Sequence, residues 1–219
     1  MKRIIFILCL VLFAGKAGAT DPVYLLERFT EAKMYFSNGT FAEGRVNYEL
    51  TTGKVQYLLD GELMEVPDDN NMTSIVFPGG RTFIQHSPNK FYEQIRRENG
   101  STVEIYWKLK EVNVGNVGAY GTTTQAAVTS LRITTLPGGG TTVGDYEHPV
   151  YQKDVFQQKS DNEYIFSKNG KDYKVKTLKN VYKAFSSQQD KIKAFVEEKK
   201  LSMLNAGEAL QVIDFVLAL

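Results

Sequence analysis

Cysteine is almost absent from this chain of 219 residues, which contains only Cys9. No intrachain disulfide can therefore form, and the fold must depend on a hydrophobic core of sufficient size. Histidine is also scarce: only His86 and His148 are present, far apart in the sequence. Transition metals are bound by clusters of His, Cys or carboxylate residues. We therefore predict no metal site and no cofactor, and we expect each histidine to lie in a turn or loop.

Long apolar runs are absent except at the N-terminus. Met1-Lys2-Arg3 precedes the apolar run 4–14, and Ala17-Gly18-Ala19 follows it. A charged start, a short apolar stretch and an A-x-A end are typical of a secretory signal peptide. The run is shorter than the roughly 18 residues that a membrane anchor needs. We predict cleavage after Ala19 and a single exported domain over 20–219, in the periplasm or at the cell surface, without a transmembrane anchor.

The chain also lacks an excess of charge of one sign. Without the three basic residues of the leader, 26 − 3 = 23 basic residues remain against 25 acidic ones, a net charge of −2. Nucleic acids and anionic membranes are bound by basic surfaces, so we do not expect either as the main partner. Because Cys9 belongs to the predicted leader, a cysteine nucleophile is excluded from the exported domain.

Turn dipeptides are abundant between runs rich in Tyr, Phe, Val and Ile. Asn38-Gly39, Asp60-Gly61, Asn99-Gly100 and Asn169-Gly170 are of the type that favours tight β-hairpins. They predict an α+β, mainly β fold: an antiparallel meander, as a curved sheet or open barrel, over 20–176. The expected strands cover 31–37, 40–51, 54–59, 62–66, 73–77, 81–85, 90–98, 101–112, 150–157, 163–168 and 171–176.

Two further regions differ in pattern. Residues 115–149 are rich in Gly and Thr, and we interpret them as a mobile loop that contains one candidate strand, 128–135. Residues 177–219 have helical periodicity and predict three short helices. The second is expected to begin at Ser187, with Asp190 reaching back to the helix start, and the third to begin at Asn205.

Several C-terminal motifs carry a resemblance to a known group. They are Tyr173-Lys174-Val175-Lys176, Lys191-Ile192-Lys193-Ala194-Phe195, Lys200-Leu201 and the acidic-apolar segment 208–216. The chain resembles a group of uncharacterised, signal-bearing envelope proteins of Gram-negative bacteria over about 150 residues. The resemblance implies an exported β-rich domain with a helical tail, and it implies no catalytic residues.

Assembled catalytic motifs are missing from the sequence. It contains neither a G-x-S-x-G elbow nor an H-E-x-x-H motif. The segments 68–71 and 138–142 lack the spacing of a calcium loop and of a phosphate-binding loop, and we interpret them as a polar turn and a flexible loop. Five glutamates fall on expected strands, where we predict a solvent-facing side of the sheet; the alternative is a carboxylate pair for hydrolysis. They are Glu49, Glu62, Glu65, Glu93 and Glu104.

Aromatic residues are the one compositional excess, at 12% of the chain. Five of them are candidates for ligand or partner binding because they fall on adjoining strands: Tyr48, Tyr57, Tyr92, Tyr106 and Trp107. Their alternative role is packing within the sheet. The preferred hypothesis is a non-enzymatic, exported envelope protein that acts as a protein-interaction or assembly module. Glycan or lipid binding by a concave aromatic face is the second hypothesis, and a carboxylate-dependent hydrolase is the third.

Overall fold

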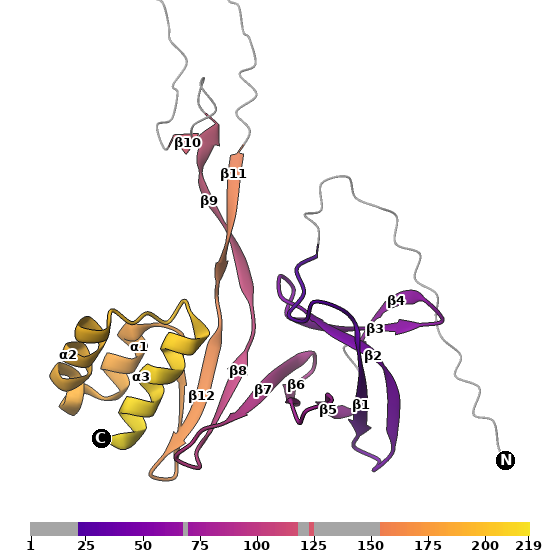
Figure 1. The fold of residues 1–219 in the computed structure, drawn as a ribbon, viewed down its shortest axis with the longest axis horizontal. Coiled ribbons are helices and arrows are strands. Elements are labelled where there is room, and N and C mark those ends of the chain that lie inside the picture. The colour runs from indigo at the N-terminus through magenta and orange to yellow at the C-terminus, as the bar shows by residue number, and fades with distance from the viewer. Residues whose placement is uncertain (1–21, 68–69, 118–122, 125–153) are drawn as a thin grey trace, which may run out of the picture.

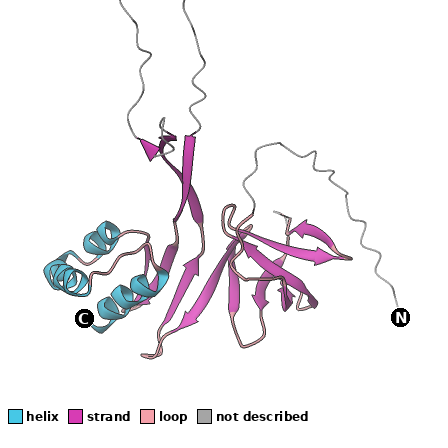
Figure 2. Ribbon diagram, turned by 45° about the horizontal axis from the view of Figure 1, so that its top comes forward, coloured by secondary structure: helices cyan, strands magenta, loops and turns pink. Residues whose placement is uncertain are grey.

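The computed structural model describes residues 22–67, 70–117, 123–124 and 154–219 (Figure 1). The predicted leader and the candidate strand 128–135 lie outside the described residues. The described part is mainly antiparallel β-sheet followed by three C-terminal α-helices, which confirms the predicted fold class. Figure 2 shows the helices gathered at one end and the strands filling the rest.

The strands form one ten-stranded sheet and one three-stranded sheet. The order in the larger sheet is β13-β12-β8-β7-β6-β5-β1-β2-β3-β4, and in the smaller sheet β10-β9-β11. Their bounds are β1 Thr30–Phe36, β2 Phe41–Glu49, β3 Lys54–Leu59, β4 Glu62–Glu65, β5 Met72–Val76, β6 Thr82–Ser87, β7 Lys90–Arg96, β8 Thr102–Tyr106, β9 Leu109–Val117, β10 Thr123–Thr124, β11 Asp154–Ser160, β12 Glu163–Lys168 and β13 Lys171–Val175.

Local turn chemistry explains most of the neighbouring strand pairs. Both residues of Asp60-Gly61 and of Asn169-Gly170 have positive φ, as a type I′ hairpin turn requires. At Asn38-Gly39 and Asn99-Gly100 only the glycine has positive φ, and the asparagine side chain instead accepts hydrogen bonds from the residue two positions later. All four dipeptides therefore reverse the chain, but only two do so by the expected type I′ turn.

Several predicted strand boundaries are wrong. The predicted strand 150–157 continues to Ser160 as β11, while 150–153 lie outside the described residues. The segment 101–112 is interrupted at Trp107 and Lys108, so that β8 ends there and β9 begins as part of a second sheet. β9 then continues to Val117, inside the region that the sequence predicted as loop from residue 115. We call the ten-stranded sheet with the three helices the body, and the β9–β11 pair the arm. The arm continues the β8–β12 pair away from the body as a narrow ribbon (Figure 1).

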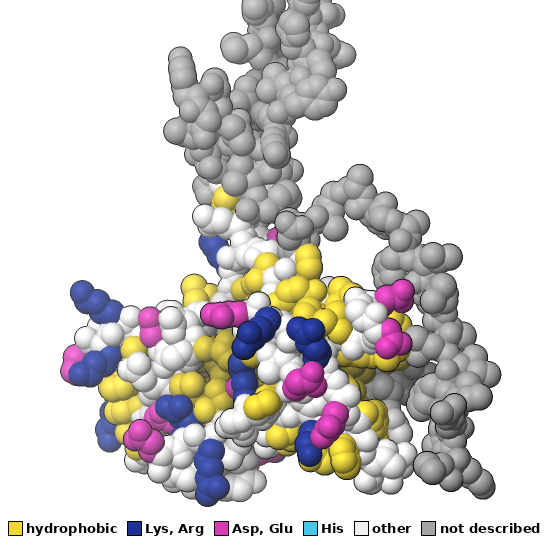
Figure 3. Space-filling model, turned by 45° about the vertical axis from the view of Figure 1, so that its right-hand side comes forward, with side chains coloured by type: hydrophobic (Ala, Val, Ile, Leu, Met, Phe, Trp, Pro, Cys, Tyr) yellow, Lys and Arg dark blue, Asp and Glu magenta, His cyan; other side chains and the backbone are white. Residues whose placement is uncertain are grey.

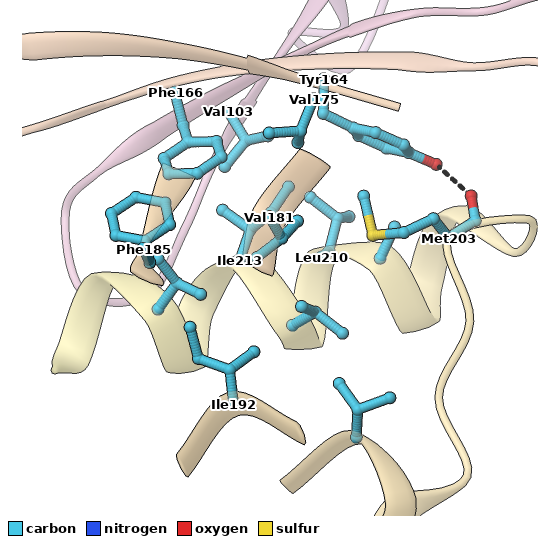
Figure 4. Close-up of a cluster of buried hydrophobic side chains, with 14 of the residues drawn as sticks. Val103, Tyr164, Phe166, Val175, Val181, Phe185, Ile192, Met203, Leu210 and Ile213 are labelled. Atoms are coloured by element: carbon cyan, nitrogen blue, oxygen red, sulfur yellow. Dashed lines mark hydrogen bonds between the residues drawn. The ribbon is translucent and has the colours of Figure 1, made fainter. Parts of the chain in front are cut away.

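Two buried clusters hold the body together. The first lies between the helices and strands β8, β12 and β13, and includes Tyr164, Val181 and Ile213 (Figure 4). Ile105 belongs to the same cluster. The second fills the curled N-terminal part of the sheet. In β8, Ile105 belongs to the first cluster and its chain neighbour Tyr106 to the second. Because successive side chains of a strand point to opposite faces, β8 is covered on both faces.

The three helices are α1 Leu178–Ala184, α2 Gln189–Lys199 and α3 Ala206–Ala218. Asn205 caps α3 by accepting a hydrogen bond from the Glu208 backbone N–H, as the sequence predicted. α2 differs from the prediction: a short 3₁₀ turn occupies Ser186–Gln188, and no side chain caps the helix start, so Asp190 does not reach back to it. Among the described residues, no helix has the length and hydrophobicity needed to span a membrane.

Candidate functional site

Four of the five aromatic candidates meet where the curled N-terminal strands lie against β7 and β8. Tyr48, Tyr92 and Tyr106 are 2%, 2% and 7% exposed, and the rings of Tyr92 and Tyr106 are 5.3 Å apart. Trp107 is half-buried beside them. We call these four residues the aromatic cluster. Tyr57, on β3, is half-buried and packs against the same core. The three tyrosines of the cluster therefore fill the interior and are not presented to a partner.

Glu93 connects the aromatic cluster to β6 and its preceding turn. Its carboxylate accepts from Arg81 Nε at 2.5 Å and from Arg81 Nη2 at 2.7 Å, and from Trp107 Nε1 at 2.6 Å. Only 8% of the Glu93 side chain is exposed. A buried carboxylate is stable when charged donors satisfy it in this way, so Glu93 is a structural anchor rather than a free acid.

Glu163 connects the cluster to the edge strand β13. The Tyr92 hydroxyl donates to Glu163 Oε1, and Lys174 Nζ lies 2.6 Å from the same oxygen. Burial alone would raise the pKa of Glu163, but the hydrogen bonds from Lys174 and Tyr92 outweigh burial and lower its pKa. Burial and the Glu163 charge raise the pKa of Tyr92. Glu163 is therefore harder to protonate and Tyr92 harder to deprotonate. Neither side chain is suited to proton transfer near neutral pH.

A third carboxylate, Glu104, binds the histidine that the sequence placed in a turn. His86 lies in β6, and its Nε2 is 2.8 Å from Glu104 Oε2, while Gln94 Nε2 donates to Glu104 Oε1 at 3.0 Å. The imidazole ring lies 4.5 Å from the Tyr92 ring. His86, Glu104 and Tyr92 thus extend the same polar network toward the surface.

The prediction that the strand glutamates face solvent is wrong for two of them. Glu49 and Glu93 are buried, because the sheet curls over itself and covers the side that was expected to face solvent. Glu49 accepts hydrogen bonds from the backbone N–H groups of Thr51 and Thr52 in the β2–β3 turn. Within the described segments, no group of three or more His, Cys, Asp and Glu residues is arranged to hold a metal ion.

The interior of the curled sheet is filled by its own side chains. The space between Val46, Tyr48, Ile75 and Phe83 does not admit a water molecule. A separate surface pocket of about 330 Å³ lies between the β7–β8 turn and the end of α3, and is lined by Arg97, Glu98, Asn99, Asp214 and Ala218. The guanidinium of Arg97 is already bound by the Asp214 carboxylate on two nitrogens. Neither space is an apolar, concave site of the kind that takes a glycan or lipid.

Charges on the surface are mixed. Figure 3 shows basic and acidic side chains beside one another on one face of the body, with hydrophobic side chains between them. The largest exposed apolar side chains include Phe41, which is 57% exposed and lies 6.0 Å from the Tyr35 ring, and Leu204 at the break before α3. The Lys33–Glu43 ion pair lies beside Phe41. The face drawn in Figure 3 therefore carries charges of both signs and no patch of one sign that selects a charged partner.

The arm is fixed to both halves of the body at its base. Leu109 N donates to Leu50 O at 2.8 Å, which ties β9 to the N-terminal strands. Asp161 lies between β11 and β12; its carboxylate binds Lys110 at 3.2 Å and Lys176 at 3.4 Å. Asn162 Oδ1 accepts from Lys108 N at 3.0 Å across the same junction. The direction in which the arm leaves the body is therefore set by specific contacts.

Comparison with known proteins gives no assignment for this arrangement. The chain matches no protein family, no curated protein and no solved structure against which it was compared.

Three carboxylates with lowered pKa values predict that the protein loses stability in acid. Despite burial, hydrogen bonds and ion pairs lower the pKa values of Glu49, Asp161 and Glu163. A lowered folded-state pKa stabilises the fold above the unfolded value, about 4 for these groups, and this stabilisation disappears as the pH falls further. We expect the free energy of unfolding, measured by urea denaturation, to decrease steadily from about pH 5 to pH 3.

The matched variant for this measurement is Glu163→Gln. Its amide oxygen still accepts from Tyr92, but the side chain no longer titrates. The variant is expected to show a shallower acid slope than the parent chain. A free energy of unfolding that is constant between pH 5 and pH 3 in the parent chain would contradict the prediction.

Proposed function

We propose that this protein is an exported, non-enzymatic module of the bacterial envelope that binds another protein chain through its arm. The observation that carries the proposal is the β9–β11 pair, which extends from the body as a ribbon (Figure 1). Among the described residues, β10 covers β9 only at Asn116 and Val117, so most of the arm has two strands. A two-stranded ribbon is marginally stable in water, and three or more strands or a packed surface are needed to stabilise it. A partner that adds to the ribbon supplies this missing contact.

Two features of the body agree with a binding role. The three tyrosines of the aromatic cluster are buried, and the space in the adjoining core between Tyr48, Ile75 and Phe83 does not admit a water molecule. The carboxylates Glu93, Glu104 and Glu163 are each held by donors within the protein. The export leader predicted from residues 1–19, and the resemblance to envelope proteins, support the proposed location.

The proposal is tested by photo-crosslinking in cells. A photoreactive amino acid is placed at Gln158, which is exposed on β11, or at Asn99, which is exposed in the β7–β8 turn of the body. Irradiation is expected to give a defined higher-mass product from the Gln158 position and not from the Asn99 position. Recovery of monomer alone from both positions would count against an interaction through the arm.

A further inference from the structure

The two sheets have four terminal strands in the described part of the chain: β4, β13, β10 and β11. β10 has only two residues, which leaves three longer edges to compare. β4 is four residues long and carries Glu62 and Glu65 at its two ends. β13 is five residues long, of which Lys171, Asp172 and Lys174 are charged. Short length and charge are the means by which proteins prevent an edge strand from pairing with another chain. Both of these edges are therefore protected.

The edge formed by β11 lacks this protection. β11 has seven residues, and only Asp154 and Lys159 are charged. Its central positions Gln157 and Gln158 are neutral and exposed, and among the described strands only β9 pairs with it, on one side. Because the arm is pinned at its base through Asp161 and Leu109, this edge is held away from the body in a fixed direction. It offers a row of backbone donors and acceptors to an extended strand.

We propose that the strand that pairs with this edge is β11 of a second copy of the chain, in antiparallel orientation about a two-fold axis at Gln157. This inference rests on the proposed function and names the partner. Centring on Gln157 overlaps all seven residues: Asp154 lies opposite Ser160, Val155 opposite Lys159, and Phe156 opposite Gln158. No charge is placed opposite a like charge, which would oppose pairing.

A second copy fits the edge better than an unrelated strand for two reasons. The pairing joins the β9–β11 pairs of two copies into four adjoining strands, so that each copy supplies strands that the other needs for stability. A two-fold contact also uses the same edge in both copies, and it closes both edges at once. The result is a discrete dimer rather than an open-ended fibre.

Single-cysteine crosslinking tests the partner and the register together. In a Cys9→Ser background the introduced cysteine is the only one in the chain. Residues directly opposite in an antiparallel pair have Cβ atoms about 5 Å apart, and diagonal residues are about 7–8 Å apart. Under mild oxidation of the purified protein, Gln157→Cys is therefore expected to give the most disulfide-linked dimer, Gln158→Cys less, and Lys159→Cys almost none. The body variant Asn99→Cys is the control for random collision.

The results separate this inference from the proposed function. A yield of disulfide-linked dimer that decreases as the cysteine is moved from position 157 to positions 158 and 159 supports the pairing. Equal dimer yields from Gln157→Cys and Asn99→Cys, or no dimer from any variant, overturn it. If the crosslinks in cells join the arm to a different protein, the proposed function stands and the second copy is wrong. If neither experiment gives a crosslink through the arm, both proposals fall.

Sedimentation equilibrium gives a measurement that does not depend on cysteine. Gln157→Lys places two like charges opposite each other at the two-fold axis, and we expect a dimer about fivefold weaker. Gln157→Thr is the matched variant, since threonine is neutral and suits a strand, and its dimer should match that of the parent chain. A parent chain that remains monomeric at all concentrations, or equal dimerisation of both variants, overturns the proposal.

Discussion

Replacement of Arg81 by methionine is expected to lower the free energy of unfolding by about 3–5 kcal/mol. Arg81 satisfies both carboxylate oxygens of Glu93, whose side chain is 8% exposed. Methionine retains an unbranched aliphatic side chain but removes the positive guanidinium, which also lies over the Phe83 ring at 5.5 Å. The Glu93 carboxylate then keeps only the hydrogen bond from Trp107, and a buried charge without a counter-charge is costly.

Two further variants show whether this loss comes from the unpaired carboxylate. Arg81→Met combined with Glu93→Leu removes both charges, and it should recover a large part of the stability in urea denaturation. Lys33→Met breaks the Lys33–Glu43 pair, in which both side chains are more than half exposed, and should cost less than about 1 kcal/mol. If Arg81→Met is no more destabilising than Lys33→Met, Glu93 is not the buried anchor described above.

The fold class was predictable because its signals are local. A type I′ turn is encoded by two adjacent residues, as at Asp60-Gly61, and a helix cap by residues three apart, as at Asn205 and Glu208. The pairings of β1 with β5 and of β8 with β12 join distant segments. No local pattern encodes them, and the sequence predicted a meander without this order of strands.

The hydrogen bonds and ion pairs of Glu93 and Glu163 were not predictable for the same reason. Tyr92 and Glu163 are 71 positions apart, and no spacing rule relates them. Alternating residues of β8 point to two faces, but no local pattern reveals that the curled sheet covers one face and the helices cover part of the other. Arg81, Glu163 and Lys174 were therefore missed, and Glu93 was assigned to a solvent-facing side.

The candidate aromatic residues illustrate what composition alone can indicate. Tyr48, Tyr92 and Tyr106 do come together, as neighbouring strands suggested, but as part of the core. Aromatic residues favour β-sheets whether they bind a partner or fill the interior, so the excess of Tyr and Phe carries no information about exposure. The arm was missed because its strand β9 continues into a Gly- and Thr-rich segment that is typical of a loop.

Gly53→Ala is expected to lower the free energy of unfolding by about 2–5 kcal/mol, because two costs combine at this position. Gly53 has φ +74°, a conformation that costs alanine about 1–2 kcal/mol. An added Cβ would also collide with the hydroxyl of Tyr106, which is buried in the aromatic cluster. Overpacking of this kind typically lowers the stability by a further 1–3 kcal/mol.

Gly61→Ala isolates the collision from the backbone cost. Gly61 has φ +87° in the equivalent place of the next hairpin, but a Cβ there meets nothing within 4 Å. It should cost only the backbone term of about 1–2 kcal/mol. Adding Tyr106→Phe removes the hydroxyl, the nearest atom to the Cβ of Gly53→Ala, and leaves the ring carbon Cζ at 2.9 Å. The double variant should therefore lose less than the sum of the single changes. Additive losses would mean that the β2–β3 turn does not rest on Tyr106. The curled strands would then not close over β8, and the burial of the aromatic cluster would lose its explanation.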